Sequence, residues 1–341
     1  MTKKHEVFDY LNNYMSAQKW LGHYRTRGSK YHMGRALYIF CHDMNMNPDE
    51  ILKMRREQEQ HLYDLIEEFG IKKTLPLFVI AQGIRATRSF LRIHRLDAPS
   101  VVGEIAMNPP KIKPVRVPTR KSLQQFLENA KRPQDKTLII FLAATGIARG
   151  SIEHMMLKNI EPEWHKSNPT ATASEFIEQL KEITTPHIQI IGQILGNGDT
   201  TLKGGGCGKY KGTEQHTFMT KECKDMLIKY LENRITPRDT LKTYSPLFSS
   251  RTEYTGMNSE TVASIFKRIS KKGLVFSPHD LRRFFQTALE NVRISKNWIQ
   301  VLKGRKVRGE DSPYSRPSIE YMRTSYKMAE QYLTIYTEEK V

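Results

Sequence analysis

The stretch His279-Asp280-Leu281-Arg282-Arg283 places an imidazole and two guanidiniums at the start of a helix that apolar spacing predicts over 281–292. Alone, a His-x-x-Arg pair at a helix start is more often structural than functional. Two later features strengthen a functional interpretation of this pair. Leu302-Lys303-Gly304-Arg305 adds basic residues after another expected helix, and Tyr314 follows nine residues beyond it.

Two basic features precede this stretch in the same half of the chain. Arg149 follows an apolar helix and a glycine turn in Thr145-Gly146-Ile147-Ala148-Arg149-Gly150. Lys209 and Lys211 lie in a glycine-rich segment, 196–212, that breaks any regular element. Each signal is weak by itself, so the order of these residues along the chain carries the interpretation.

Among the tyrosines of this region, Tyr314 is the one best suited to move. It lies between two prolines in Pro313-Tyr314-Ser315-Arg316-Pro317, so backbone preferences keep it outside a regular helix. Tyr321 and Tyr326 lie on the expected final helix, 318–336, where packing is enough to explain an aromatic residue. Tyr314 is therefore the tyrosine of this region that we expect to lie outside regular structure.

The order of these residues (Arg, Lys, His-x-x-Arg, a further basic residue, then Tyr) resembles that of the tyrosine recombinase, or phage-type integrase, family. The resemblance covers about 119–336. Tyr314-Ser315-Arg316-Pro317 and the helix after it look like the archaeal and archaeal-virus integrases, in which a basic residue can replace the histidine before the tyrosine. The chain departs from the bacterial pattern at Arg305, which occupies the place of that histidine, and in an arginine motif one residue longer than usual. The stretch from Arg149 to Lys211 is also long for the family, which indicates an insertion.

The resemblance implies a catalytic set for cutting and rejoining DNA. A tyrosine can attack phosphorus and hold the cut strand as a 3′-phosphotyrosyl ester. Arginines can bind the non-bridging oxygens, a histidine can accept the tyrosine proton, and a lysine can protonate the departing 5′ oxygen. This chemistry implies neither a metal nor another cofactor. The set is Tyr314, Arg149, Lys211, His279, Arg282 and Arg305, with Lys209 second and Lys203 third as alternatives for the lysine.

The composition favours a polyanionic partner. The 341 residues include 54 Lys and Arg against 36 Asp and Glu, a formal net charge of +18. Double-stranded DNA suits this charge, and the alternative is a charge that only aids solubility. Three scattered cysteines argue against a disulfide framework. Since no apolar run is long enough for a transmembrane helix and the first residues do not resemble a signal peptide, we expect a cytoplasmic protein with no membrane partner.

The predicted fold class is mainly α with a small β-sheet. Residues 1–107 are predicted to be helical, and they correspond by position to the core-binding, DNA-binding domain of the family. Residues 108–118 form a basic, proline-rich linker. Residues 119–341 form an α+β catalytic domain with a C-terminal tail helix, and 187–195 and 213–220 supply its strands.

Local signals place several helices within this scheme. Val7, Leu11 and Met15 recur at helical spacing, and Asn47-Pro48-Asp49-Glu50 is typical of a helix start. The polar stretch 161–185 is expected to be irregular except for one short helix near 173–182.

Six basic side chains outside the catalytic set are candidates for phosphate contact. Three arginines lie three or four residues apart on the predicted helix 75–93 and share one face, for which a solvated surface is the alternative. Three more lie in the linker, where prolines favour an extended strap. The six are Arg85, Arg88, Arg92, Lys111, Lys113 and Arg116.

The leading hypothesis is a site-specific DNA recombinase, an integrase of an archaeal or viral mobile element, with a homotetramer on DNA implied by the resemblance. A type IB topoisomerase shares the chemistry and acts as a monomer. A catalytically silent DNA-binding protein with the same fold is the alternative from another class. The expected final helix, 318–336, favours a recombinase, since that family docks its tail on a neighbouring subunit; packing on its own domain is the alternative.

Overall fold

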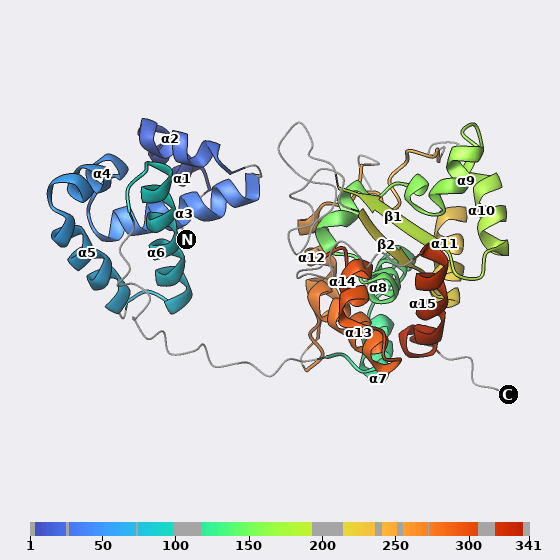
Figure 1. Ribbon diagram of the computed structural model, residues 1–341. Coiled ribbons are helices and arrows are strands. Elements are labelled where there is room, and N and C mark those ends of the chain that lie inside the picture. Colours follow the sequence, from blue (N-terminus) through green and yellow to red (C-terminus); the bar gives the residue numbers. More distant parts are fainter. Residues whose placement is uncertain are drawn as a thin grey trace. The chain divides into compact units, whose positions relative to one another are not determined.

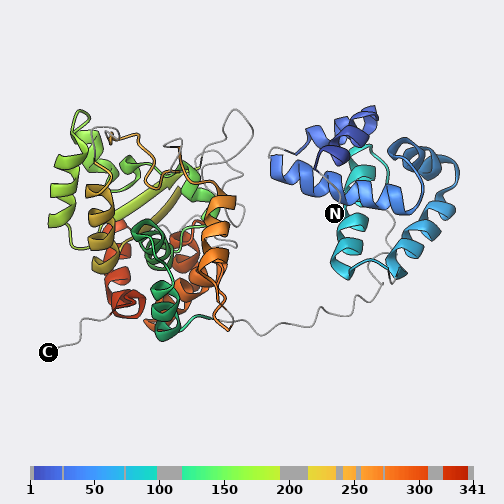
Figure 2. The same ribbon diagram turned by 180° about the vertical axis from the view of Figure 1, so that it is seen from behind.

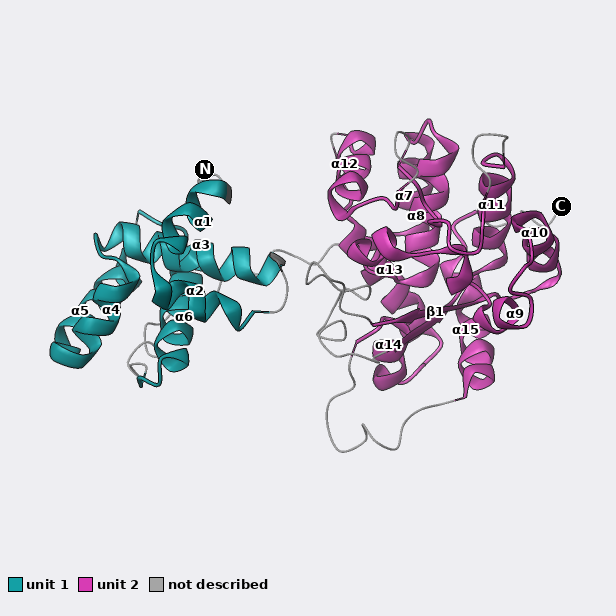
Figure 3. Ribbon diagram, turned by 90° about the horizontal axis from the view of Figure 1, so that it is seen from above, with its two compact units in different colours: residues 1–114, 196–199 teal, residues 115–195, 200–341 magenta. Residues whose placement is uncertain are grey.

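The protein consists of two compact units (Figure 3). The computed structural model describes residues 4–24, 27–72, 74–97, 117–192, 214–235, 241–250, 255–271, 273–305 and 318–336. Unit 1 takes in the described residues up to 97, and unit 2 takes in those from 117 onward. Each unit has its own hydrophobic core.

Unit 1 is helical throughout its described residues. Its core is built from large aromatic side chains that are fully buried, among them Trp20, Phe40, Phe69 and Phe90. Contacts between helices are most extensive between the third and the sixth. The helices are α1 (Lys4–Asn12), α2 (Met15–Gly22), α3 (Arg27–Asp43), α4 (Pro48–Glu57), α5 (Glu59–Ile71) and α6 (Leu77–Ile93).

The start of α4 confirms the helix start predicted at 47–50. Asn47 Oδ1 accepts a hydrogen bond from the Glu50 backbone N–H at 3.0 Å, and Glu50 Oε2 accepts one from the Asn47 N–H at 2.7 Å. This reciprocal pair satisfies backbone donors that the first helical turn leaves free. One prediction in this unit is wrong: Met15 does not share a face with Val7 and Leu11. The chain turns after α1, and Met15 begins α2 as an exposed residue.

Unit 2 is organised around α8 (Pro133–Thr145), which is buried on all sides from Thr137 onward. Every side chain from Leu138 to Thr145 is inaccessible or nearly so. Figures 1 and 2 show α8 enclosed by the other helices of the unit, with the two strands along one side. These helices are α7 (Arg120–Glu128), α9 (Pro162–Ser167), α10 (Ala173–Glu182), α11 (Lys221–Glu232), α12 (Ser259–Ile269), α13 (Pro278–Asn291), α14 (Lys296–Leu302) and α15 (Ile319–Leu333), with the 3₁₀ segments η2 (Arg149–His154) and η3 (Leu157–Asn159).

The sheet of the described residues has two antiparallel strands, β1 (His187–Ile191) and β2 (Glu214–Phe218). The register pairs His187 with Phe218 and Ile191 with Glu214. Both strands were predicted, and the glycine-rich segment 196–212 lies outside the described residues. The prediction of a mainly α fold with a small β-sheet is confirmed.

The polar stretch 161–185 is more regular than predicted. Its helix α10 occurs at the predicted place, but α9 was not predicted. The residue before α9, Glu161, has φ +47, a left-handed conformation that no simple sequence rule assigns to glutamate.

The final helix, α15, packs against its own unit. Its apolar side, Met322, Tyr326, Ala329 and Leu333, is buried in the core of unit 2 and contacts α13 and β2. This favours the alternative that the sequence left open, packing on its own domain, over docking of this side on a neighbour. Within the described residues, no helix has the length and apolar character needed to cross a membrane.

Candidate active site

Four of the predicted catalytic residues line one pocket of about 450 Å³ in unit 2. They come from three separate segments of the chain: η2, the start of α13, and the turn after α14. None of the described residues that line this pocket is acidic. The lining consists of Ala148, Arg149, Ser277, Pro278, His279, Arg282 and Arg305.

The first turn of α13 fixes the spacing of the His-x-x-Arg pair. Ser277 precedes the helix and Pro278 opens it, with the Ser277 N–H donating to Asp280 Oδ2 at 2.9 Å. Asp280 therefore caps the start of the helix. Residues three apart lie on the same side of a helix, so His279 and Arg282 face the pocket together.

Arg282 is buried, with only 5% of its surface exposed. Its Nη1 donates to the Gly146 carbonyl at 2.5 Å, and its Nη2 donates to the Lys303 carbonyl. The guanidinium thus joins the turn after α8 to the turn after α14. Since arginine keeps its proton in proteins, this geometry places a permanent positive charge at the pocket floor.

The turn after α8 requires glycine and directs Arg149 to the pocket. Gly146 has φ +62, and a Cβ there would lie 2.3 Å from the ring of Phe285. Ala148 is extended, at φ −72 and ψ 138, and it carries the chain into η2, where Arg149 is exposed.

A second left-handed glycine orients Arg305 after α14. The Arg305 N–H donates to the Gln300 carbonyl and the Gly304 N–H to the Val301 carbonyl, each at 2.8 Å. This pair of bonds is a Schellman motif, which needs a residue such as glycine at its left-handed position, here φ +62. Arg305 Nε is buried and has no hydrogen-bond partner among the described residues.

The cationic surroundings act on the imidazole of His279. Partial burial lowers the pKa of His279, and Arg283, Arg282 and Arg305 lower it further, while Asp280 acts in the opposite direction. The imidazole is therefore neutral at pH 7 and able to accept a proton.

Lys303 and Gln286 belong to the surroundings of this pocket and were not among the predicted site residues. Lys303 is 3% exposed, and its ammonium donates to Gln286 Oε1. The lysine was visible in Leu302-Lys303-Gly304-Arg305, but its burial depends on tertiary contacts.

Several predicted site residues lie outside the described part of the chain. These are Tyr314, the three lysine candidates Lys211, Lys209 and Lys203, and the linker residues Lys111, Lys113 and Arg116. Their roles remain predictions from the sequence.

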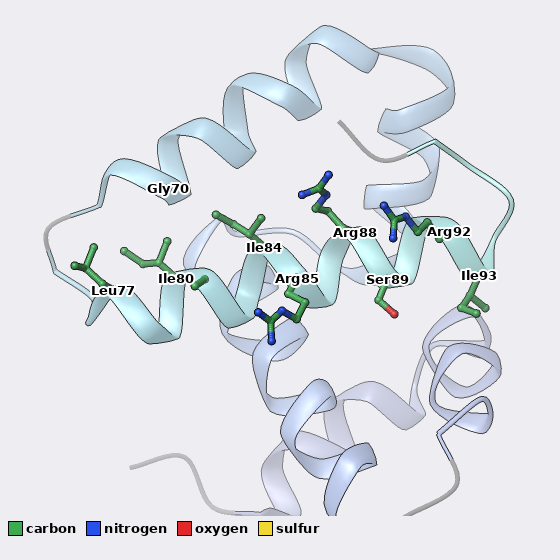
Figure 4. Close-up of a pocket in the computed structure, with 10 residues that line it drawn as sticks. Gly70, Leu77, Ile80, Ile84, Arg85, Arg88, Ser89, Arg92 and Ile93 are labelled. Carbon is green, nitrogen blue, oxygen red and sulfur yellow. The ribbon is translucent and has the colours of Figure 1, made fainter. Parts of the chain in front are cut away.

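A second basic surface lies on α6 in unit 1. Arg85, Arg88 and Arg92 line a single pocket of about 490 Å³, although Arg85 projects from the other side of α6 in the view of Figure 4. Figure 4 shows Arg88 and Arg92 projecting from one side of α6. Arg88 Nε is buried without a hydrogen-bond partner in the described structure. The pocket also has an apolar part that the sequence reasoning missed, formed by Leu77, Ile80, Ile84 and Ile93.

The fold is that of integrases of known structure. The integrase of the Tn1549 transposon, solved with transposon right end DNA, aligns over 92% of this chain and 98% of its own, at 13% identity and a TM-score of 0.54. The same integrase with circular intermediate DNA aligns over 95% and 96%, at 14% identity and a TM-score of 0.51. XerA recombinase aligns over 96% and 98%, at 18% identity and a TM-score of 0.39. No protein-family profile and no curated protein matches the sequence.

Proposed function

We propose that this protein is a site-specific DNA recombinase, an integrase that cuts and rejoins double-stranded DNA through a 3′-phosphotyrosyl intermediate. The observation that carries the proposal is the meeting of Arg149, His279, Arg282 and Arg305 in one pocket, which has no acidic residue among the described residues that line it. The buried Nε of Arg305 faces no acceptor in the described structure, and a phosphate oxygen is the acceptor that such a donor would find on DNA.

In this mechanism the hydroxyl oxygen of Tyr314 attacks the scissile phosphorus, and the bond from phosphorus to the 5′ oxygen breaks. His279 accepts the tyrosine proton. It can do so because its lowered pKa keeps the imidazole neutral at pH 7. Lys211, with Lys209 and Lys203 as alternatives, gives a proton to the departing 5′ oxygen. Rejoining reverses these transfers.

The arginines supply electrostatic stabilisation. Attack adds negative charge to the non-bridging oxygens of a five-coordinate phosphorus, and guanidinium donors held in place beforehand stabilise that charge. Arg282 is held by two carbonyls, so it is oriented before DNA arrives. Arg149 and Arg305 reach the same pocket from η2 and from the turn after α14.

DNA affinity comes from the basic residues outside the pocket. Unit 1 acts as the core-binding domain, with Arg85, Arg88 and Arg92 on phosphates, and Lys111, Lys113 and Arg116 follow the backbone. A net charge of +18 predicts affinity that falls steeply with salt. The working form is a homotetramer on the attachment DNA of an archaeal or viral mobile element.

A suicide DNA substrate, in which the cleaved end diffuses away, tests the proposal. Wild type should become covalently linked to DNA, and Tyr314→Phe should not. Tyr321→Phe is the matched control, because Tyr321 is an exposed tyrosine on α15. An adduct that persists in Tyr314→Phe would assign the nucleophile elsewhere.

Further outcomes separate the alternatives. Arg149→Ala should abolish the adduct and keep DNA binding, since the side chain is exposed. Binding of DNA with no adduct in wild type would instead support a catalytically silent DNA-binding protein. Relaxation of supercoiled DNA by a monomer, without strand exchange, would support a type IB topoisomerase activity.

A further inference from the structure

Lys303 is a buried lysine next to Arg282 and Arg305 of the candidate active site. It caps the C-terminus of α14 and is 3% exposed. Its carbonyl accepts a hydrogen bond from Nη2 of Arg282, and its ammonium donates to Oε1 of Gln286 on α13. It does not line the pocket, so it does not contact a ligand there.

The charges around Lys303 are mostly of its own sign. From α13 it faces Arg282 and Glu290, and from its own turn it faces Arg305. The strand β2, which also packs against α14, contributes the neutral Gln215, whose Nε2 donates to the Leu302 carbonyl at 2.8 Å.

The carboxylate of Glu290 does not neutralise Lys303 through a hydrogen bond, because Gln286 lies between them. Gln286 Nε2 donates to Glu290 Oε1 at 2.7 Å, and Gln286 Oε1 accepts from Lys303. Burial, together with Arg305 and Arg282, lowers the pKa of Lys303 to about 8. A buried cation is costly when no anion is hydrogen-bonded to it, so the folded protein keeps this charge at the expense of stability.

We propose that Lys303 is a positioning residue of the active site: its carbonyl orients Arg282, and its ammonium adds positive potential at the pocket that the scissile phosphate of DNA neutralises. The inference rests on the proposed function, because it takes a DNA phosphate as the missing anion. The ammonium is present below about pH 8 and is lost above it, so this contribution fades as pH rises.

The test compares Lys303→Met with wild type in single-turnover adduct formation on the suicide substrate, from pH 6.5 to pH 9.5. Methionine keeps an unbranched chain and the backbone carbonyl but removes the charge. We expect wild type to be roughly tenfold faster than Lys303→Met at pH 7, with the two rates converging above pH 9. The ratio of the two rates cancels ionisations that both proteins share, including those of Tyr314 and the catalytic lysine.

Lys303→Arg supplies the conservative rescue. The arginine guanidinium does not titrate in this range, so the variant should keep the wild-type rate near pH 7. At high pH its rate of adduct formation should not fall through loss of the charge at position 303. A rate ratio between wild type and Lys303→Met that is constant across pH would overturn the proposal, since a purely structural role has no reason to follow the lysine titration. Thermal melts confirm that each variant is folded.

Binding of inorganic phosphate separates this inference from the proposed function. The ring protons of His279, followed by NMR, report occupancy of the pocket in the full chain. Phosphate should bind Lys303→Met roughly tenfold more weakly than wild type at pH 7 and equally at pH 9.5. If wild type forms no adduct but this difference is present, the recombinase proposal fails and the anion site stands. Equal affinities at pH 7 overturn the role of Lys303, whatever the cleavage result.

Discussion

Replacing Gly304 with alanine should destabilise unit 2 and disturb the turn that carries Arg305. Gly304 has φ +62, and holding alanine in this left-handed conformation costs about 1–2 kcal/mol. The new Cβ would also lie 2.6 Å from Oε1 of Gln215, with Cδ and Cβ of the same side chain within 3 Å. Because Gln215 is fully buried, its whole side chain must move.

The displacement of Gln215 adds a second cost. Its Nε2 donates to the Leu302 carbonyl, and loss of a buried hydrogen bond of this kind costs about 1–3 kcal/mol. The free energy of unfolding of unit 2 should therefore fall by about 2–5 kcal/mol. Gly273→Ala is the matched control, because Gly273 has φ +85 but no atom within 4 Å of the added Cβ, so only the backbone cost applies.

Buried thiols report the unfolding of each unit separately. Cys223 in unit 2 and Cys41 in unit 1 are both fully buried, so each becomes reactive only when its surroundings open. Thiol labelling across a urea series, read by mass spectrometry, should show an earlier Cys223 midpoint in Gly304→Ala and an unchanged Cys41 midpoint.

The contribution of Gln215 can be isolated by a double-mutant cycle. In a Gln215→Gly background, which also removes the Cβ that would lie 2.9 Å from the added methyl group, the cost of Gly304→Ala should fall towards that of Gly273→Ala. Equal costs for Gly304→Ala and Gly273→Ala in the native background would refute the reasoning, since the contact with Gln215 would then not be what demands glycine.

Two further predictions concern the same region. Tyr326→Phe removes the hydroxyl that donates to the Ala144 carbonyl at 2.8 Å, and it should lower the stability of unit 2 by about 1–3 kcal/mol, seen as an earlier Cys223 labelling midpoint; an unchanged midpoint would show that this bond contributes nothing. NMR titration of His279 should give a pKa below 6.5, and Arg283→Gln should raise it, because removing a nearby cation favours the protonated ring. A downward shift in that variant contradicts the assignment of the cause.

Much of the fold follows from local signals that tertiary contacts do not override. The start of α4 is set by Asn47 and Glu50 through bonds within four residues, so the sequence is sufficient to predict it. The apolar run of α8 predicts a helix, and its burial on all sides agrees with that run. By contrast, α9 begins after a left-handed Glu161, a conformation that tertiary contacts impose, and it was missed for that reason.

In the candidate site too, some features could be predicted from the sequence and others depend on tertiary contacts. The order of basic residues predicted that Arg149, His279, Arg282 and Arg305 would meet, and they line one pocket. The sequence did not reveal that Arg282 is a buried tether between two turns, nor that Lys303 is buried beside it. Both depend on the packing of α8 and α14 around α13, which no spacing within a single segment encodes.

The end of α8 has a consequence for how such a chain would change over evolutionary time. Three successive carbonyls there are bonded by three different elements: Tyr326 of α15 donates to Ala144, Thr217 of β2 to Thr145, and Arg282 of α13 to Gly146. Arg282 would therefore stay under selection for folding in a lineage that had ceased to cut DNA. Arg149 is exposed and would be free to drift. Retention of the exposed arginine would therefore say more about activity, in proteins of this fold, than retention of the buried one.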